Sequence, residues 1–177
     1  MTLELPELLE IEWDNYADKI NNIYDIYLNE IYGKLSFFGK PVHCRIIPIY
    51  DNKHECFWHL MTQDFEKRKT NGERFPDLNR CRRIHWIAKI ITNYQSSDIV
   101  CWVKQHRRKV GRKSLVEDRI YLWAKKYNFV VILGKQKKPE GYQLITSYCT
   151  NDPDTICRFE KQSVEYPDPR KVRDLKK

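Results

Sequence analysis

The spacing of apolar residues predicts two helices in the first half of the chain. Apolar and aromatic side chains recur at every third or fourth position from Asp14 to Tyr32, which is the period of an amphipathic helix, and Gly33 follows as a stop. The same period returns from Leu78 to Asn93. Shorter apolar or aromatic runs lie between these helices and predict three extended segments: residues 35–38, 44–50 and 55–61.

From residue 97 onward the period of apolar positions changes from 3.6 to 2, which is the period of β-strands. Turn residues at 125–128 and 137–141 separate the later strands, so three strands follow one another as an antiparallel meander. Asp152-Pro153 can begin a final short helix that extends to about Ser163. The predicted strands are 99–103, 115–123, 129–133 and 142–149.

These elements predict an α+β fold in which N-terminal helices pack on one face of a four-stranded antiparallel sheet, a meander, followed by a short C-terminal helix. We expect three parts: an acidic amphipathic N-terminal helix (1–34), an α+β domain (35–165) and a loose charged tail (166–177). With 177 residues, of which 41% are hydrophobic, the chain is long enough for one domain with a substantial core.

The net charge of +8 is unevenly distributed along the chain. Residues 1–32 carry eight acidic residues and one lysine, a net charge of −7, whereas the other 145 residues carry 31 basic and 16 acidic residues, a net charge of +15. A basic body of this kind predicts binding to a polyanion. The acidic helix has two interpretations: it docks across the anion-binding site as a built-in competitor, or it packs its apolar stripe on the core.

The densest positive charge lies in ten residues that we expect to form a loop between two strands. Six fixed positive charges so close together repel one another, so an anion such as a nucleic-acid phosphate would stabilise the segment. The alternative is a solvated loop without a ligand. The candidate nucleic-acid-binding residues are Lys104, Arg107, Arg108, Lys109, Arg112 and Lys113.

The cysteines and the N-terminus predict a cytoplasmic protein without a metal or cofactor. Six cysteines occur without any Cys-x-x-Cys pair, so a zinc site built from them and from histidines would lack the usual ligand spacing. Glu4, Glu7 and Glu10 interrupt the first apolar residues, so we expect no signal peptide. No apolar run approaches the ~20 residues that span a membrane. The cysteines are therefore interpreted as reduced, mostly buried thiols.

The sequence also lacks the motifs of several enzyme classes. It has no glycine-rich phosphate loop, no Gly-x-Ser-x-Gly elbow and no compact cluster of acidic residues, which disfavours a two-metal nuclease. Metal-free cleavage of RNA needs less, because the ribose 2′-hydroxyl is itself the nucleophile. A proton acceptor, a proton donor and a cation that stabilises the charged phosphorane are enough, and histidine and arginine suit these roles.

Two of the five histidines are candidates for such a role. His59 is the first, because two large aromatic residues precede it and a hydroxyl residue follows shortly after. His85 is the second, and it lies between an arginine and a tryptophan on the second predicted helix. For either residue, a structural or solvent-exposed side chain is the alternative.

Four short strings resemble the barnase/EndoU/colicin/RelE-like RNase superfamily, and in particular its phage-associated and polymorphic-toxin members. They are Trp58–Thr62, Arg80–Ile87, Arg119–Trp123 and Tyr142–Tyr148. The resemblance covers about residues 35–150, so the α+β domain is expected to be RNase-like. It implies an RNA site on the concave side of a four-stranded antiparallel sheet. It also implies cleavage of tRNA or mRNA without a metal, leaving a 2′,3′-cyclic phosphate.

By position, the resemblance assigns roles to five catalytic candidates. His59 would be the general base or acid, and Arg83 and Arg119 would hold the scissile phosphate. Thr146 would orient this phosphate, with Tyr148 on the same face of the strand. The intervening serine should point to the other face unless a bulge exchanges the two. The alternatives are an ordinary strand residue for Thr146 and a surface salt bridge for Arg119.

The sequence thus predicts a toxin-like or phage-associated endoribonuclease that binds RNA. An antitoxin or immunity protein is a further expected partner, and no membrane is expected. A non-catalytic RNA- or DNA-binding domain that uses the same basic face is the main alternative, and a protein-interaction domain is the third. The oligomeric state and the RNA target do not follow from the sequence.

Overall fold

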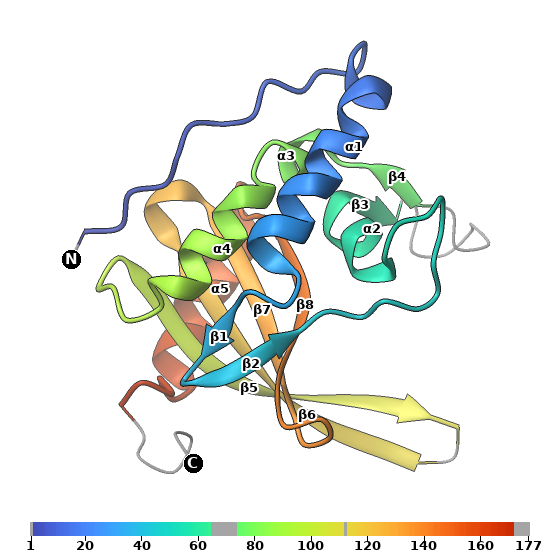
Figure 1. Ribbon diagram of the computed structural model, residues 1–177. Coiled ribbons are helices and arrows are strands. Elements are labelled where there is room, and N and C mark those ends of the chain that lie inside the picture. Colours follow the sequence, from blue (N-terminus) through green and yellow to red (C-terminus); the bar gives the residue numbers. More distant parts are fainter. Residues whose placement is uncertain (1, 65–73, 112, 172–177) are drawn as a thin grey trace.

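The computed structural model describes residues 2–64, 74–111 and 113–171, which form an α+β fold around a six-stranded mixed sheet. In their order across the sheet, the strands are β1 (Ser36–Phe37), β2 (Lys40–His43), β8 (Gly141–Cys149), β7 (Phe129–Gln136), β6 (Lys113–Ala124) and β5 (Ile99–Val110). Strand β2 pairs with β8 in parallel, and the other neighbours are antiparallel (Figure 1). A small second sheet pairs β3 (Thr62–Asp64) with β4 (Arg74–Pro76).

Strand β7 lies inside the sheet and is buried on both faces. Its first six residues are all buried, which is typical of a strand that is covered on two sides. Alternate residues belong to two separate core clusters. We call the face that carries Leu122, Val131 and Leu133 the inner face, and the face that carries Tyr121 and Ile132 the outer face.

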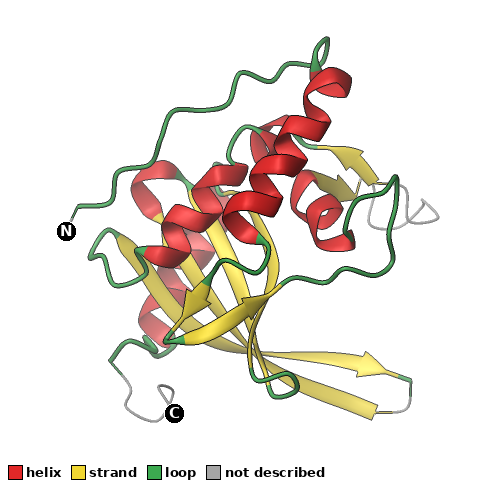
Figure 2. Ribbon diagram, viewed as in Figure 1, coloured by secondary structure: helices red, strands yellow, loops and turns green. Residues whose placement is uncertain are grey.

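Helices cover both faces of the sheet. On the inner side lie α1 (Tyr16–Ile26), its π-helical continuation η1 (Tyr27–Ile31) and α4 (Ile84–Thr92), whereas α5 (Pro153–Glu165) lies on the outer side (Figures 1 and 2). The Asp152 carboxylate accepts a hydrogen bond from the Thr155 N–H at 2.9 Å, which explains why α5 begins at Pro153 as the sequence predicts. None of the described helices is long and apolar enough to cross a bilayer.

The predicted architecture, N-terminal helices on a four-stranded antiparallel meander, is wrong although the α+β class is right. Strands β1 and β2 extend the sheet to six strands and add a parallel pair. Parallel pairing joins Val42 to Tyr142, so no local sequence pattern encodes it. Helix α5 also covers the face opposite to α1 and α4, because Trp102, Tyr121 and Trp123 give the outer face an apolar surface of its own.

Two predicted elements in the middle of the chain are also wrong. The stretch 55–61 is not extended but forms helix α2 (Glu55–Met61). Its buried residues, Cys56, Phe57, Leu60 and Met61, are spaced with the period of a helix. The prediction relied on the aromatic content of the stretch and overlooked this period. The stretch 78–93 is not one helix. It forms α3 (Leu78–Cys81), capped by the Asp77 carboxylate, and α4, which begins after a break.

The basic segment is not a loop but the outer half of a long hairpin. Strands β5 and β6 pair without interruption from Ile99↔Ala124 to Val110↔Lys113, and their ends extend beyond the rest of the sheet (Figure 1). The outer half of this hairpin is a two-stranded ribbon that covers no apolar core. Its residues therefore do not alternate between apolar and polar, which is the pattern by which a strand is recognised in a sequence.

The acidic N-terminal residues before α1 form an extended segment that is tied to α3 and α4. Leu3 and Ile11 are buried, and the Arg82 Nε donates to the carbonyl oxygen of Ile11 at 2.7 Å. His85 Nε2 donates to the carbonyl oxygen of Glu7 at 2.8 Å, so this second candidate histidine holds the segment in place. Of the apolar stripe expected to pack on the core, Tyr16 and Ile20 do so from α1, whereas Trp13 is 65% exposed.

The C-terminal residues up to 171 are docked against β5 and the loop before it. The Val103 N–H donates to the carbonyl oxygen of Pro167 at 3.0 Å. Arg170 binds the Asp168 carboxylate and donates to the carbonyl oxygens of Tyr94 and Ser96. The part of the expected loose tail that the structure describes is thus held by hydrogen bonds.

Replacing Phe159 by alanine should destabilise the fold by about 3–5 kcal/mol, because its ring packs between Trp102 and Trp123 at centroid distances of 5.1 and 5.6 Å. Urea unfolding monitored by tryptophan fluorescence measures this loss. Val164→Ala is the control on the same helix, since Val164 is 89% exposed and should cost about 0.5 kcal/mol or less. Equal costs for the two variants would contradict docking of α5 on the outer face.

Candidate functional site

The outer face changes from apolar to charged as β5 and β6 leave the part of the sheet that α5 covers. Residues directly opposite each other in a ladder share a face. Lys104 pairs with Arg119, and His106 pairs with Glu117. Arg119 is two residues from Tyr121, so all four charged or titratable side chains continue the outer face.

A cavity of about 160 Å³ opens beside these residues, where the outer face meets α2. His59 of α2 and Arg119 of β6 both line it, so the structure brings together two residues that the sequence had singled out independently. Within the part of the chain that the structure describes, the lining residues are Arg45, Glu55, Cys56, His59, Glu117, Arg119, Gln143, Leu144 and Ile145.

Gly134 leaves room for the Ile145 side chain, which forms part of the cavity wall. This glycine lies opposite Arg119 in the ladder, and a Cβ atom at this position would lie only 3.1 Å from the Ile145 Cδ1. The β7–β8 ladder also shifts register here, because Leu133 pairs with Leu144 and Ile132 with Thr146, which leaves Ile145 as the extra residue of a bulge. The bulge and the missing side chain together place Ile145 over Gly134, at the wall of the cavity.

His59 reaches the cavity because α2 packs beside β8. Strand β2 pairs only with the first residues of β8, so α2 and α3 can lie against the rest of that strand. Phe57 and Leu60 anchor α2 in the inner core, and His59 remains half-exposed. The end of α2 is fixed by Arg80, whose Nη1 donates to the carbonyl oxygens of Thr62 at 2.9 Å and His59 at 3.5 Å.

The ion pairs in the cavity are loose. The Arg119 Nη2 lies 3.9 Å from a Glu117 carboxylate oxygen, and the Arg45 Nη1 lies 3.9 Å from a Glu55 carboxylate oxygen. Pairs at this separation are weak, and the buried Nε of Arg119 has no hydrogen-bond partner. The Arg119 guanidinium thus keeps donor capacity that suits a phosphate.

His106 is the second imidazole of this region, and its pKa is lowered from 6.5. Partial desolvation is the largest cause, and the positive charge of Arg119 adds to it, while Glu117 opposes the shift. The neutral imidazole is therefore the prevailing form near neutral pH, and a neutral imidazole can accept a proton.

Thr146 and Tyr148 both lie on the outer face, as expected from their spacing. Thr146 pairs with Ile132 and Tyr148 with Val130, whereas the intervening Ser147 pairs with Val131 and is buried on the inner face. The bulge precedes Thr146, so it does not exchange the two faces. Neither the Thr146 nor the Tyr148 hydroxyl forms a hydrogen bond with another described residue.

Arg83 is not among the residues that the structure brings to the cavity. Its Nη1 donates to the carbonyl oxygen of Asn79 at 2.9 Å, and its guanidinium lies 5.1 Å from the Trp86 ring. From the same basic stretch, Arg80 approaches the outer face instead, with its guanidinium 5.8 Å from the Tyr148 ring. The break between α3 and α4 directs Arg80 toward the outer face and Arg83 toward Trp86. The sequence pattern did not reveal this break.

The predicted nucleic-acid-binding residues lie along the hairpin as far as they are described. Lys104 is near the sheet, with its Nζ 5.3 Å from the Tyr166 ring, and Arg107 is exposed further out. Arg108, Lys109 and Lys113 belong to the two strands, but their side chains are outside the described part, and Arg112 lies outside it entirely.

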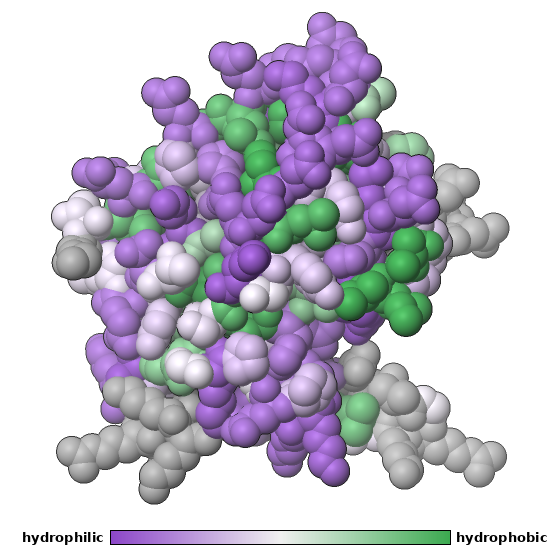
Figure 3. Space-filling model, viewed as in Figure 1, coloured by the Kyte–Doolittle hydropathy of each residue, from purple (hydrophilic) through white to green (hydrophobic). Residues whose placement is uncertain are grey.

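An apolar loop forms one rim of the cavity. Residues 44–54 join β2 to α2, and Figure 3 shows a hydrophobic patch over this loop. Ile46, Ile47, Ile49 and Tyr50 are exposed there, and the cavity residues Arg45 and Glu55 flank them. In residues 2–64, 74–111 and 113–171, no group of three His, Cys, Asp or Glu side chains is placed to hold a metal ion.

Sequence reasoning missed His106, Glu117, Arg45 and Gln143 as members of the site. For His106 and Glu117 a signal was present in the two-residue spacing of strands. Lys104 and His106 are two residues apart on β5, and Glu117 and Arg119 are two residues apart on β6, so each pair lies on one face. The interpretation of the segment as a loop concealed that signal. Arg45 and Gln143 have no sequence signal of their own.

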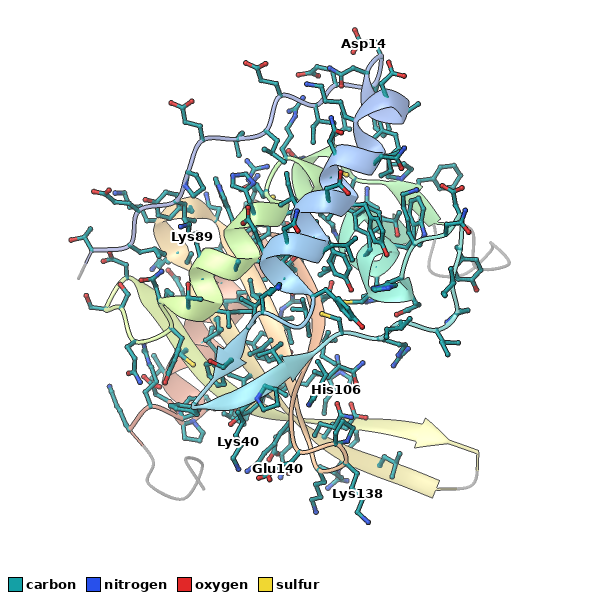
Figure 4. All side chains as sticks on the ribbon, in the orientation of Figure 1. Asp14, Lys40, Lys89, His106, Lys138 and Glu140 are labelled. Carbon is teal, nitrogen blue, oxygen red and sulfur yellow. The ribbon has the colours of Figure 1, made fainter. Side chains whose placement is uncertain are left out.

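Replacing Arg119 by glutamine should raise the pKa of His106, because removal of a positive charge favours the imidazolium. In the wild type, His106 should lose its proton at a lower pH than an unperturbed histidine. NMR titration of the imidazole resonances measures both effects. Lys89→Gln removes an equal charge from an exposed position of α4, well away from His106 in Figure 4, and should leave this pKa unchanged. An unchanged or lowered pKa in Arg119→Gln would contradict the geometry.

No protein-family model matches this chain, and searches of curated proteins and of solved structures likewise find no match. Similarity therefore assigns it neither a family nor an activity. Its function must be inferred from the outer-face site itself, because the positions and chemistry of these side chains limit the roles that they can have.

Proposed function

We propose that this protein is a metal-independent endoribonuclease whose reaction takes place in the cavity between α2 and the outer face of the sheet. The observation that carries the proposal is that His59 and Arg119 line one cavity although they lie 60 positions apart in the chain. A proton-transfer group and a phosphate-binding cation are the minimum that RNA cleavage requires.

The arrangement supports a transesterification. One imidazole accepts the proton of the 2′-hydroxyl, the 2′-oxygen attacks the phosphorus, and the bond to the 5′-oxygen breaks as that oxygen gains a proton. The products are a 2′,3′-cyclic phosphate and a free 5′-hydroxyl. His106, held neutral beside Arg119, suits the acceptor, and His59 can then supply the proton. Arg119 stabilises the charged phosphorane.

Two further features support the proposal. The Thr146 hydroxyl lies on the same face and is available to orient a phosphate oxygen. The strings around His59, Arg119 and Thr146 resemble the barnase/EndoU/colicin/RelE-like RNases. On that resemblance we propose tRNA or mRNA as the substrate, a toxin-like or phage-associated role in the cytoplasm, and an antitoxin or immunity protein as a partner.

His59→Ala and Arg119→Gln should each reduce cleavage of total RNA by about 10²–10⁴-fold, because each removes one group that acts in the transition state. The assay is performed in EDTA with purified protein, and the products are tested for the cyclic phosphate. Lys89→Ala is the matched control and should cleave as the wild type does. If the wild type leaves RNA intact in EDTA, or His59→Ala cleaves at the wild-type rate, the proposal fails.

A non-catalytic RNA-binding domain is the second candidate, and the projecting basic hairpin favours it. Arg107→Ala should lower RNA affinity and reduce the slope of log affinity against log salt by about 0.7, the value for one phosphate contact on a single strand. Filter binding over a range of salt concentrations measures this slope. Binding that depends on Arg107, together with no cleavage by any variant, would support the second candidate over the first.

A further inference from the structure

A second cluster of cationic and hydroxyl groups lies on the outer face beyond the cavity. Tyr148 of β8 is its centre, and the Arg80 guanidinium of α3 lies 5.8 Å from the Tyr148 ring. The same guanidinium is ion-paired with Asp77, its Nε 3.3 Å from a carboxylate oxygen, and its Nη1 donates to the carbonyl oxygen of Thr62. The proposed chemistry uses neither arginine of this cluster. The question is what ligand a partly buried phenol between cations could bind.

Arg158 of α5 approaches the cluster from the other side. Its guanidinium lies 5.6 Å from the Phe159 ring, and that ring packs on Tyr121 and Tyr148 with centroids 5.8 and 6.4 Å apart. Arg158 is exposed, and its Nη2 donates to the Thr155 hydroxyl at 3.2 Å, which restrains the guanidinium. Burial raises the pKa of Tyr148, whereas the charges of Arg158 and Arg80 both oppose that rise, as expected for cations close to the phenol.

The cluster and the cavity are aligned along the strands. Arg119, Tyr121 and Trp123 follow one another on the outer face, and the ladders connect Tyr121 through Ile132 to Thr146 and Trp123 through Val130 to Tyr148. Each step of two residues covers about 7 Å, so the Tyr148 row lies about 14 Å from the Arg119 row along the strand direction. A single nucleic-acid strand carries one phosphate per nucleotide, so one strand can reach both places.

We propose that Arg158 and the Tyr148 hydroxyl form a second phosphate-binding subsite, to which Arg80 adds positive charge and which holds single-stranded RNA about two nucleotides away from the phosphate in the cavity. This inference rests on the proposed function, because it takes RNA as the ligand. Guanidinium groups bind phosphate with parallel hydrogen bonds, and the phenol adds a neutral donor. The Thr146 hydroxyl lies between the two subsites, where it can contact the intervening backbone.

The subsite predicts a dependence of affinity on chain length. The probes are 2′-O-methyl oligonucleotides of two to six nucleotides, which cannot be cleaved because their nucleophile is blocked. For the wild type, affinity should rise at the length whose added phosphate reaches Arg158. In Arg158→Ala this step should be lost, a decrease of roughly tenfold for a charged hydrogen-bonded contact. The salt slope for the longer probes should fall by about 0.7.

Two further variants make the test specific. Tyr148→Phe keeps the ring and removes the hydroxyl, so it should weaken binding only at and beyond the same length. Lys89→Ala removes one exposed positive charge from α4 on the inner side and should keep the wild-type step. Equal steps in the wild type and Arg158→Ala, or an equal loss in Lys89→Ala, would overturn the subsite.

The two proposals fail in different ways. If unmodified RNA is not cleaved by the wild type but the Arg158-dependent step is present, the nuclease proposal fails and the subsite stands. If RNA is cleaved and the step does not depend on Arg158, the subsite fails alone. The variants are expected to fold, because Arg158 is exposed and Tyr148→Phe preserves the packing.

Discussion

The register of β6 between β5 and β7 determines both the core and the candidate site. Because side chains alternate across a strand, this register places Leu122 on the inner face and Tyr121 on the outer face. The same alternation continues past the end of the core and assigns Arg119 and Glu117 to the outer face. A shift of one residue would bury these charges and expose the core, so the position of the site depends on the burial that stabilises the sheet.

The sequence predicts those parts of the fold and site that depend on local periodicity. The N-terminal helix, the apolar strand β7 and the beginning of α5 are examples, since each has a period or a cap that lies within a few residues. The parallel pairing of β2 with β8 and the placement of α5 on the outer face depend on contacts between distant segments. His59 and Arg119 could be chosen from their residue types, but the cavity that they share lies between α2 and a bulged strand, which no local pattern brings together.

The acidic N-terminal segment shows how tertiary contacts decide between two interpretations of a charge pattern. Its net negative charge could have served to block the basic face. The backbone of this segment is instead held by Arg82, His85 and Trp86, on the side of the molecule that α3 and α4 form. No described residue of the segment is among those that line the cavity. Leu3 and Ile11 are buried, so release of the segment would expose apolar surface.

Several local departures from a stable sheet coincide at the cavity. Gly134 weakens a central strand, the bulge interrupts a ladder, and the Arg119 Nε is buried without a partner. The Ile145 side chain packs where a residue larger than Gly134 would need space, so the glycine and the bulge compensate each other. The buried Arg119 Nε has no such compensation among the described residues. Its cost is tolerated where a ligand supplies the missing partner, because an anion bound by Arg119 would satisfy the donor. A purely structural cavity would gain stability from a closer partner for Arg119.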